Sequence, residues 1–490
     1  MNLYSLFLKN FSDDKKIIFN DDEINYKEFK NLIDIIASNI NESHNKIAIL
    51  SDNQKVISLF LFACAKNGKI LITLNKNLKT HQINLQLKIS TPDIIVVDSD
   101  INLKALNYCN KKFYVDDFFR ETRKKYNIYI KNFFNKNFII TFSSGTTSLP
   151  KPILYTQKIK YQRFLQIKDI FNIKKNDTIF SVSSIDHSLG QRLLFLALLN
   201  GCNFIYFSKY NFKEIKKLCL EYKISFAILP SNYLNLLKKY LLNKSIFIPK
   251  IVSAASTLIT SEKYSLIRTG ISLYEMYGAS EIGTVTSINF NKNRKFISSV
   301  GKVLKNIKIK IVDNQNKSLR IGQVGEIICK TPLKFKGYYK SQNLTKKSLT
   351  KGYFKTGDLG KIDRNNYLYF VSRKQDVIIS SGKNIYPIDI ERELLKLSYL
   401  KESAIIGIKD KFFGEIVFAV CVLKRKISNA EKKIKKYLSK RVSGFQLPLG
   451  YAFLKKLPKN NLGKVQKNIL RKIYNKKKID LTKNLRGLLN

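Results

Sequence analysis

Short apolar, β-branched runs alternate with longer amphipathic stretches through the first half of the chain. The apolar segment 55–66 has the length of a helix and lies between two such runs. The runs that we predict to be strands lie at 46–50, 69–74, 92–98, 111–117, 137–143, 203–208, 225–230 and 249–255. Strand, helix and strand at this spacing indicate parallel α/β layers.

Two changes of pattern follow later in the chain. From Val300, strand-like runs at 300–315, 324–332 and 366–372 are joined by short Asn- and Gly-containing turns, which is typical of an antiparallel, barrel-like section. After Arg373, strands, a glycine turn and amphipathic helices form a unit of about a hundred residues. We therefore predict an α/β protein with a large N-terminal domain of several subdomains, namely parallel α/β layers and a small β-barrel-like section, and a smaller α+β C-terminal domain.

Composition limits the partners that we expect. The chain has 88 Lys and Arg residues against 36 Asp and Glu residues, so its formal net charge is +52. Such an excess suits a polyanion, for example nucleic acid, an anionic membrane or an acidic protein. The lysines are spread along the whole chain between Asn and Ile residues, which favours a generally solvated surface, and we expect no nucleic-acid partner.

Cysteines, histidines and apolar runs indicate the compartment. None of the six cysteines forms a C-x-x-C pair and the three histidines are scattered, so we expect reduced core thiols and no His-based metal site. The longest apolar runs, 56–65 and 193–199, fall short of the roughly 20 residues that span a bilayer. Because the N-terminus also lacks a secretory pattern, we predict a soluble, cytoplasmic protein without stable membrane insertion.

The stretch 142–151, FSSGTTSLPK, follows a predicted strand and concentrates polar donors. Its glycine lets the backbone turn, and its hydroxyls and lysine supply the several donors that a phosphate chain needs. The spacing does not fit a G-x-x-x-x-G-K-[ST] loop. Taken alone, the stretch also fits a Ser/Thr-rich surface turn.

Four further motifs follow in order: EMYGASEIG at 275–283, YFKTGDLGKID at 353–363, SRKQDVIISSGKNIYPIDIE at 372–391 and LPKNNLGKVQKNIL at 457–470. Together with the first stretch, they resemble the adenylate-forming (AMP-binding) superfamily over essentially the whole chain, in particular its acyl-CoA synthetase or acyl-CoA ligase type. The resemblance implies that a carboxylate attacks the α-phosphate of ATP, giving acyl-AMP and pyrophosphate, and that a thiol then displaces AMP. This chemistry needs fixed donors and cations around a crowded phosphate.

The resemblance assigns the earlier motifs to ATP and Mg²⁺. Tyr277, beside Gly278, would stack on adenine. Ser280 would face the α-phosphate and Glu281 would bind Mg²⁺, both as catalytic residues. The residues that would hold the β- and γ-phosphates are Ser143, Ser144, Gly145, Thr146, Thr147 and Lys151. Outside the motif, Tyr277 fits a core aromatic residue and Glu281 a local cap or ion pair.

The later motifs would contact the ribose and the forming acyl-phosphate. Asp358 would accept hydrogen bonds from the two ribose hydroxyls, and Arg373 would help to hold the ribose or phosphate region. Lys464 would be the catalytic lysine, because a point charge on a flexible stem suits the acyl-phosphate. Outside these motifs, Asp358 fits a tight turn beside a glycine, and Lys464 is one of many solvated lysines.

The resemblance also implies a hinge at Gln375 between an adenylation domain at 1–374 and a mobile small domain at 376–490. Gly382 would form part of the tunnel for the thiol. The chain departs from the family pattern at Gln375 and at three other positions, Ser148, Pro152 and Lys467. We expect these departures to affect ATP affinity or turnover and to leave the fold and reaction type unchanged.

The acyl pocket is expected around 181–191, lined by His187, Ala255, Ala279 and Gly301. The sequence SIDHSLG supports two interpretations. As H-S-L-G it resembles acyl-CoA ligases, in which His187 closes the pocket at the substrate carboxylate. As I-D-H-S it resembles amino-acid-activating enzymes, in which Asp186 pairs with the substrate ammonium group. The spacing to the following helix favours the first interpretation.

We therefore predict an ATP- and Mg²⁺-dependent acid–thiol ligase that activates a small-molecule acid, either fatty or otherwise hydrophobic, and transfers it to coenzyme A. The alternative is an amino-acid or acyl adenylation enzyme that loads a carrier protein, since an acidic acyl carrier protein presents the same pantetheine arm and would be attracted by the charge. A protein that binds nucleic acid or a membrane surface, and a luciferase-like oxidase, are competing classes that the ordered motifs disfavour.

Overall fold

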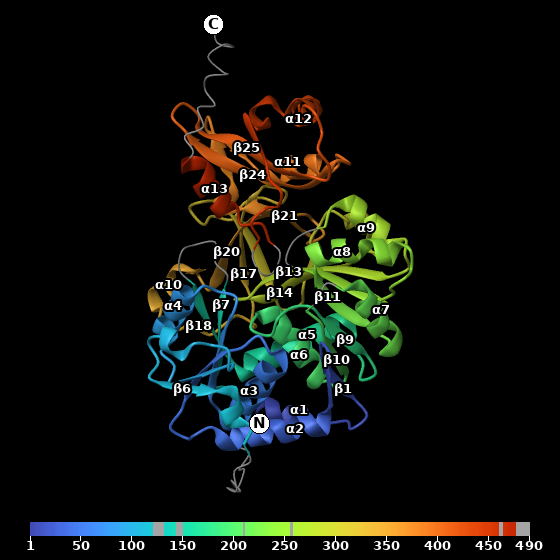
Figure 1. Cartoon of the computed structure of the whole chain (residues 1–490). Coiled ribbons are helices and arrows are strands. Elements are labelled where there is room, and N and C mark those ends of the chain that lie inside the picture. The colour runs from blue at the N-terminus through green and yellow to red at the C-terminus, as the bar shows by residue number, and fades with distance from the viewer. Residues whose placement is uncertain (121–131, 144–149, 209–210, 255–257, 460–463, 477–490) are drawn as a thin grey trace. The chain divides into compact units, whose positions relative to one another are not determined.

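The computed structural model describes residues 1–120, 132–143, 150–208, 211–254, 258–459 and 464–476 (Figure 1). Contacts between Cα atoms divide the chain into two compact units. Unit 1 consists of Met1–Ile297, Val303–Lys308 and Lys330–Phe354, and unit 2 of Ser298–Lys302, Ile309–Cys329 and Lys355–Asn490. The predicted boundary at Gln375 concerns the part of the chain that turns during a reaction, and it stays a prediction.

The first sheet of unit 1 is mainly parallel. Its strands, in spatial order, are β15 (Lys302–Val303), β14 (Gly283–Asn289), β13 (Ser272–Ala279), β12 (Lys250–Ala254), β11 (Phe226–Pro230), β9 (Thr178–Ser181), β10 (Asn203–Tyr206), β1 (Lys16–Phe19) and β2 (Asp22–Asn25). The strands from β13 through β12, β11, β9 and β10 to β1 pair in parallel, whereas β13–β14 and β1–β2 are antiparallel hairpins.

The second sheet of unit 1 is built in the same way. Its strands, in spatial order, are β18 (Gly337–Tyr338), β8 (Lys151–Thr156), β7 (Asn137–Ser143), β4 (Ile70–Leu74), β3 (Lys46–Leu50), β5 (Ile94–Val97) and β6 (Lys111–Tyr114). β7, β4, β3, β5 and β6 pair in parallel, and β8 pairs antiparallel with β7 and with β18. The strands predicted at 46–50 and 137–143 have the bounds of β3 and β7.

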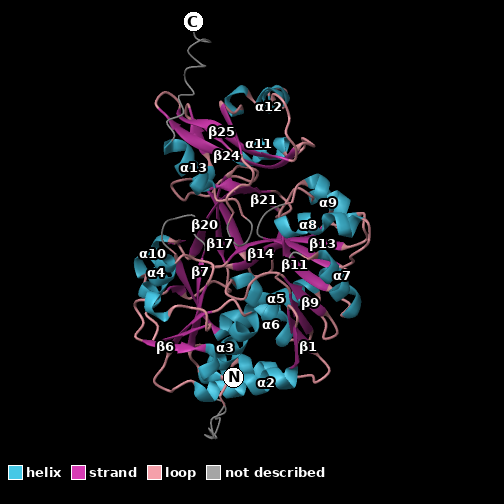
Figure 2. Ribbon diagram, in the orientation of Figure 1, coloured by secondary structure: helices cyan, strands magenta, loops and turns pink. Residues whose placement is uncertain are grey.

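Helices fill the space between the two sheets of unit 1 (Figure 2). α5 (Gln157–Phe171) packs against β7 and β8 of one sheet and β14 of the other, while α6 (Ser188–Leu198) packs on β9 and β10 and α3 (Gln54–Asn67) on β4. The remaining helices of unit 1 are α1 (Leu3–Lys9), α2 (Tyr26–Asn39), α4 (Thr80–Ser90), α7 (Phe212–Glu221), α8 (Ser231–Leu242), α9 (Thr260–Ile267) and α10 (Gln342–Lys347).

α3 shows how local sequence sets these elements. The Asn53 side chain accepts hydrogen bonds from the backbone N–H groups of Lys55 and Val56, which caps the start of the helix. Gly68 ends it with a left-handed φ of 66°. Between these caps the helix is apolar on nearly every side, as is expected for a helix buried between layers.

Unit 2 contains most of a sheet that occupies the predicted barrel-like section. Its strands are β16 (Lys308–Val312), β17 (Gly325–Lys330), β20 (Tyr353–Ile362), β19 (Leu349–Thr350) and β21 (Leu368–Arg373). The pair β20–β21 is antiparallel and places Asp358 opposite Arg373. This register positions two of the predicted site residues.

The second sheet of unit 2 belongs to the predicted α+β section. Its strands are β23 (Lys383–Ile385), β22 (Ile378–Ser380), β25 (Gly414–Leu423), β24 (Leu400–Asp410) and β26 (Gly450–Phe453). Successive residues of β24 face opposite sides: Ile405 packs in the core under α11 (Pro387–Leu394) and α12 (Ala430–Leu438), and Ile406 in the core under α13 (Lys467–Lys476). Both faces are therefore covered, which explains the continuous apolar run of this strand.

Among the described residues, no helix combines the length and the apolar character that crossing a bilayer requires.

Candidate active site

The turn between β13 and β14 carries the two residues that the resemblance places at the α-phosphate and at Mg²⁺. Residues 280–282 form this turn, and Ala279 pairs with Gly283 at its base. A Cβ atom on Gly278 would lie 2.0 Å from the carbonyl oxygen of Gly283, so only glycine fits there. Tyr277 directly precedes a register shift in β13 and keeps part of its ring exposed.

A buried arginine holds the backbone of this turn. Arg163, on α5, donates to the carbonyl oxygens of Ser280 at 2.8 Å and of Glu281 at 3.1 Å. Two further bonds, of 3.0 and 2.8 Å, go to the carbonyl oxygen of Leu333. The hydroxyl of Tyr155 also donates to the Ser280 carbonyl, at 2.8 Å. Burial lowers the pKa of Arg163, and no carboxylate of the described residues lies within 4.0 Å of its guanidinium.

The carboxylate of Glu281 is held on one side. The hydroxyl of Tyr338 donates to Oε1 of Glu281 at 2.9 Å. Burial, and then the negative charge of Glu281, raise the pKa of Tyr338, so the phenol keeps its proton and remains a donor. No donor from the described part of the chain bonds to the second carboxylate oxygen. One carboxylate oxygen fits Mg²⁺, which binds one or two carboxylates together with phosphate oxygens.

The described residues contain no group of three or more His, Cys, Asp and Glu side chains that could share a metal ion.

The predicted phosphate loop is described only at its two ends. Residues 144–149 lie outside the described ranges, and these include the predicted Ser144, Gly145, Thr146 and Thr147 and the departure at Ser148. The backbone of Ser143 ends β7 and pairs with Lys151 at the start of β8. Nζ of Lys151 lies 5.8 Å from the ring centroid of Tyr338. The lysine of the loop and the residue that holds Glu281 are therefore neighbours within unit 1.

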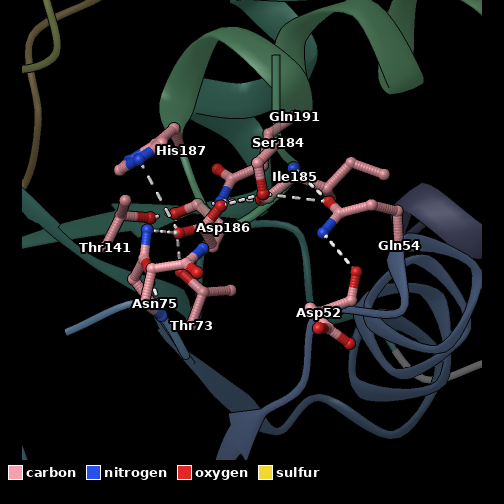
Figure 3. Close-up of polar contacts among 11 residues, drawn as sticks. Asp52, Gln54, Thr73, Asn75, Thr141, Ser184, Ile185, Asp186, His187 and Gln191 are labelled. Carbon is pink, nitrogen blue, oxygen red and sulfur yellow. Dashed lines mark hydrogen bonds and ion pairs between the residues drawn. The ribbon is translucent and has the colours of Figure 1, made fainter. Parts of the chain in front are cut away.

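A buried polar network surrounds Asp186 (Figure 3). Its carboxylate accepts hydrogen bonds from the side-chain amide of Asn75, at 2.9 Å, and from the hydroxyl of Ser184. Its carbonyl oxygen accepts from the hydroxyl of Thr73 at 3.0 Å. Oε1 of Gln54 accepts hydrogen bonds from the Ser184 hydroxyl at 3.1 Å and from the backbone N–H of Ile185 at 2.6 Å. The loop before α6 is thus tied to β4 and α3.

His187 lies beside this network at the start of α6. Its Nε2 is 3.7 Å from Oδ2 of Asp186, and its side chain is 17% exposed, against 5% for Asp186 (Figure 3). Because Asn75 and Ser184 already occupy the Asp186 carboxylate, this carboxylate is poorly placed to receive a substrate ammonium group. The arrangement favours the interpretation in which His187 contacts the acid, and both assignments stay predictions.

The other predicted pocket residues are divided between the units. Ala279 ends β13 in unit 1 and is partly exposed. Gly301 belongs to unit 2, has a φ of 113°, and accepts a hydrogen bond from the N–H of Leu368 at 2.9 Å. Ala255 lies outside the described residues.

In unit 2, three predicted site residues form a charged cluster. Nε of Arg373 lies 2.8 Å from Oδ1 of Asp358, its cross-strand partner. The Asp358 side chain is 5% exposed and that of Arg373 is 45% exposed. Burial, and then the charge of Arg373, lower the pKa of Lys464 to about 8, while Asp358 opposes the shift. Lys464 therefore carries its charge only below about this pH.

The predicted hinge lies between two ion pairs of unit 2. Lys374 pairs with Glu326 of β17 at 2.9 Å, and Asp376 pairs with Arg471 of α13 at 3.0 Å. Gln375 lies between them in a short 3-10 turn and is exposed. The residues on the two sides of Gln375 are thus attached to different elements, and the hinge stays a prediction.

Two further predicted positions lie in the α+β section. Gly382 occupies the turn between β22 and β23 with a φ of 73°, and no described atom lies within 4 Å of the Cβ that it lacks. The backbone conformation, and not a shortage of space, therefore calls for glycine there. Lys467, which departs from the family pattern, starts α13 and pairs with Glu391 at 2.7 Å.

Sequence reasoning missed the residues that hold the Glu281 turn. Arg163 and Tyr155 contact the turn from positions more than a hundred residues earlier, and Tyr338 contacts it from 57 residues later. No short motif links such positions. Lys160 and Arg163 of α5 are both buried, but the sequence does not distinguish them from Lys158 and Lys168 on the same helix.

Comparisons with known proteins agree with these observations. The AMP-binding enzyme family matches residues 7–339, and the AMP-binding enzyme C-terminal domain matches residues 389–464. The 2-succinylbenzoate–CoA ligase of Oceanobacillus iheyensis is 26% identical over 87% of this chain and 88% of its own length. That of Bacillus subtilis is 24% identical over 93% of this chain and 94% of its own length.

The fold is also that of a solved enzyme. O-succinylbenzoate coenzyme A synthetase from Bacillus subtilis, in complex with ATP and magnesium ion, superposes with a TM-score of 0.86 at 22% identity, over 96% of this chain and 99% of the other. The predicted fold class is confirmed. The predicted superfamily is confirmed as well, because the family match covers more than half of the sequence. The chain belongs to the AMP-binding enzyme family, and its enzyme class is that of the AMP-forming acyl-CoA ligases.

Proposed function

We propose that the protein activates a carboxylic acid with ATP and passes the acyl group to coenzyme A. In the first step a carboxylate oxygen attacks the α-phosphorus and the bond to pyrophosphate breaks. In the second step the sulfur of coenzyme A, having lost its proton, attacks the acyl carbon and the bond to AMP breaks. The observation that carries the proposal is the cluster of Asp358, Arg373 and Lys464 in unit 2.

This cluster has the chemistry that a ribose and an acyl-phosphate need. A carboxylate matches the two neighbouring hydroxyls of a ribose, and Asp358 is buried enough for such bonds to be strong. Lys464 is cationic below about pH 8 and is desolvated, so its charge acts on a phosphate with little screening. Arg373 is half exposed, which lets its guanidinium exchange Asp358 for a ligand.

Unit 1 would supply the phosphate and metal contacts. Glu281 would bind the Mg²⁺ of ATP, Lys151 would hold its outer phosphates, and Ser280 would face the α-phosphate. Tyr277 would stack on adenine. The metal ion, when bound, neutralises charge on the phosphate oxygens as pyrophosphate leaves.

We propose 2-succinylbenzoate, or a closely related aromatic dicarboxylate, as the acid. Relatives with this name align with 87% and 93% of the chain. This choice replaces the fatty or other hydrophobic acid that the sequence pattern led us to expect. A dicarboxylate keeps one negative charge after the other carboxylate has been activated, so its site needs a cation for the remaining one.

Arg192, on α6, is the cation that we assign to this second carboxylate. Its Nη1 donates to Oγ1 of Thr284 at 2.9 Å and lies 3.8 Å from the sulfur of Met276, both neutral. Burial, and then the charge of Arg163, lower the pKa of Arg192 to about 10, so an anion nearby would be stabilising. We expect Arg192→Met to reduce kcat/KM for 2-succinylbenzoate by about 10- to 100-fold, which corresponds to a lost charged hydrogen bond. The same variant should reduce kcat/KM for benzoate, which has no second carboxylate, by a smaller factor. The control variant Arg268→Met should reduce kcat/KM for 2-succinylbenzoate less than Arg192→Met does.

The test of the function is a pyrophosphate-release screen with and without coenzyme A. Its acids are 2-succinylbenzoate, benzoate, a series of fatty acids and the amino acids. Release with 2-succinylbenzoate, and a thioester product only with coenzyme A, would support the proposal. Release with amino acids, or thioester formation on an acidic acyl carrier protein but not on coenzyme A, would replace it by the carrier-loading alternative. If none of these acids gave pyrophosphate release, the ligase assignment would be contradicted.

A further inference from the structure

The most unusual polar arrangement outside the motifs is the support of the Glu281 turn. We propose that Tyr338 is a positioning residue that fixes the Glu281 carboxylate for Mg²⁺, and that Arg163 fixes the backbone of the same turn. The inference rests on the proposed function, because it requires that Glu281 bind the metal of ATP. Neither residue belongs to the motifs that carry the family resemblance at this turn.

The hydroxyl of Tyr338 is held in one place by its surroundings. Its strand, β18, pairs with β8, and its backbone N–H donates to the hydroxyl of Thr345 at 2.9 Å. The residue is 5% exposed, and its ring packs edge-on against Phe335 with a centroid separation of 4.8 Å. Tyrosine has few rotatable bonds, so a packed ring delivers its hydroxyl to one point. That point is Oε1 of Glu281, at 2.9 Å.

The same segment also contacts the backbone of the turn. The N–H of Phe335 donates to the carbonyl oxygen of Glu281 at 2.6 Å, two residues after the Leu333 carbonyl that Arg163 binds. Segment 333–338 therefore reaches the turn through the Phe335 backbone and the Tyr338 hydroxyl. The carboxylate and the peptide bond of Glu281 are fixed by the same short stretch of chain.

Arg163 completes this support from the other side. Its guanidinium donates four hydrogen bonds to three carbonyl oxygens, and the residue is 4% exposed. A buried guanidinium without a carboxylate is costly to bury, so its role is better explained by geometry than by stability. Gly283, which begins β14 with a φ of 76°, leaves room for it: a Cβ atom there would lie 3.2 Å from Nε of Arg163.

The arrangement assigns different tasks to the two carboxylate oxygens. A hydroxyl donor on one oxygen fixes the rotation of the carboxylate and leaves the other for the cation. Groups that orient a metal ligand in this way typically change metal affinity by about 10- to 100-fold when they are removed. A tyrosine that only filled space would have no such effect.

The test compares two Tyr→Phe variants that each lose one buried hydroxyl. Tyr338→Phe removes the bond to Glu281. Tyr26→Phe is the matched control, because its hydroxyl donates to the carbonyl oxygen of Cys202 at 2.6 Å, also within unit 1. Both variants keep their rings, so both should fold and should lower the urea midpoint by similar amounts.

The readout is Mn²⁺ binding in the presence of α,β-methylene-ATP, followed by electron paramagnetic resonance, since Mn²⁺ accepts the same oxygen ligands as Mg²⁺. We expect Tyr338→Phe to weaken Mn²⁺ binding by about 10-fold or more and Tyr26→Phe to leave it unchanged. Equal Mn²⁺ affinities in Tyr338→Phe and the unaltered protein would overturn the inference while leaving the proposed function intact. If the unaltered protein itself bound no Mn²⁺–nucleotide complex, the proposed function would fail, and the inference with it.

Discussion

Two arginines of the candidate site, Arg163 in unit 1 and Arg373 in unit 2, are held in different ways. In unit 1 the guanidinium of Arg163 is buried and donates to the backbone carbonyl oxygens of Ser280, Glu281 and Leu333. In unit 2 the guanidinium of Arg373 is 45% exposed and pairs with the carboxylate of Asp358. Lys374 beside it is also 45% exposed and pairs with Glu326.

The difference separates a fixed support from exchangeable contacts. Carbonyl oxygens cannot leave the turn that they belong to, so the bonds of Arg163 define one shape for it. The side chains of Arg373 and Lys374 are each 45% exposed, so water or a ligand can reach them and replace their carboxylate partners. We infer that the Glu281 turn is built in advance, whereas Arg373 and Asp358 rearrange when a nucleotide binds.

The largest effect is expected at Lys464. Lys464→Ala should lower the rate of acyl-AMP formation by about 10²- to 10³-fold or more, because it removes a desolvated positive charge from the forming acyl-phosphate. The rate is measured by ATP–pyrophosphate exchange, with the free energy of unfolding measured in parallel. Lys456→Ala is the control, since Lys456 lies in the same segment and is exposed. An exchange rate close to that of the control would remove Lys464 from the mechanism.

The second effect sharpens the comparison directly. Arg163→Met should lower the free energy of unfolding by about 2–4 kcal/mol, because it removes four hydrogen bonds and leaves the carbonyl oxygen of Leu333 without its donor among the described residues. Urea unfolding followed by circular dichroism gives the value. A change below about 1 kcal/mol is the size expected for an exposed ion pair. Such a result would show that the hydrogen bonds of Arg163 stabilise the protein no more than the ion pairs of Arg373 and Lys374 do.

The third effect is a pH dependence that we assign to Lys464 of unit 2. The pKa of Lys464 is lowered to about 8, so the lysine is cationic below this pH and neutral above it. The ratio kcat/KM for ATP reports the ionisation of groups on the free enzyme. It should therefore be highest below about pH 8 and fall about tenfold for each further pH unit. A lysine with an ordinary pKa of about 10.4 would give a flat profile to about pH 9.5. Such a flat profile would argue against a desolvated Lys464.

The smallest effect is expected at Lys374. Lys374→Ala removes an ion pair whose lysine is half exposed, so the free energy of unfolding should change by less than about 1 kcal/mol. Raising the salt concentration should reduce even this difference. A loss as large as that of Arg163→Met would mean that the Lys374–Glu326 pair and the contacts of Arg163 do not differ in strength.

Short sequence patterns were enough to predict many strands of the fold. The strands at 46–50 and 137–143 were found with their bounds because each is a short β-branched run beside polar residues. The β13–β14 hairpin was identified as a motif but not as two strands, since the motif's glycines and polar residues hide the period of two. β1 and β2 were missed because neither run is long enough to stand out.

Some residues of the candidate site could be predicted from the sequence, and others could not. Tyr277 to Glu281 and Asp358 lie in continuous motifs and were visible in the sequence. Arg163 and Tyr338 were not, because their roles depend on partners 117 and 57 residues away. The sequence favours His187 over Asp186 only through the spacing to the following helix. The choice became clearer only when Asn75 and Ser184 were found on the Asp186 carboxylate.

The central claim is that Asp358 and Lys464 hold the nucleotide part of an acyl-adenylate. The most direct test is a crystal structure of the protein with a non-hydrolysable mimic of 2-succinylbenzoyl-AMP. We expect both ribose hydroxyls to donate to the carboxylate of Asp358, with Nζ of Lys464 within contact distance of the group that replaces the phosphate. A mimic bound with its ribose away from Asp358, or a structure in which soaking leaves the Arg373–Asp358 pair untouched, would contradict the account.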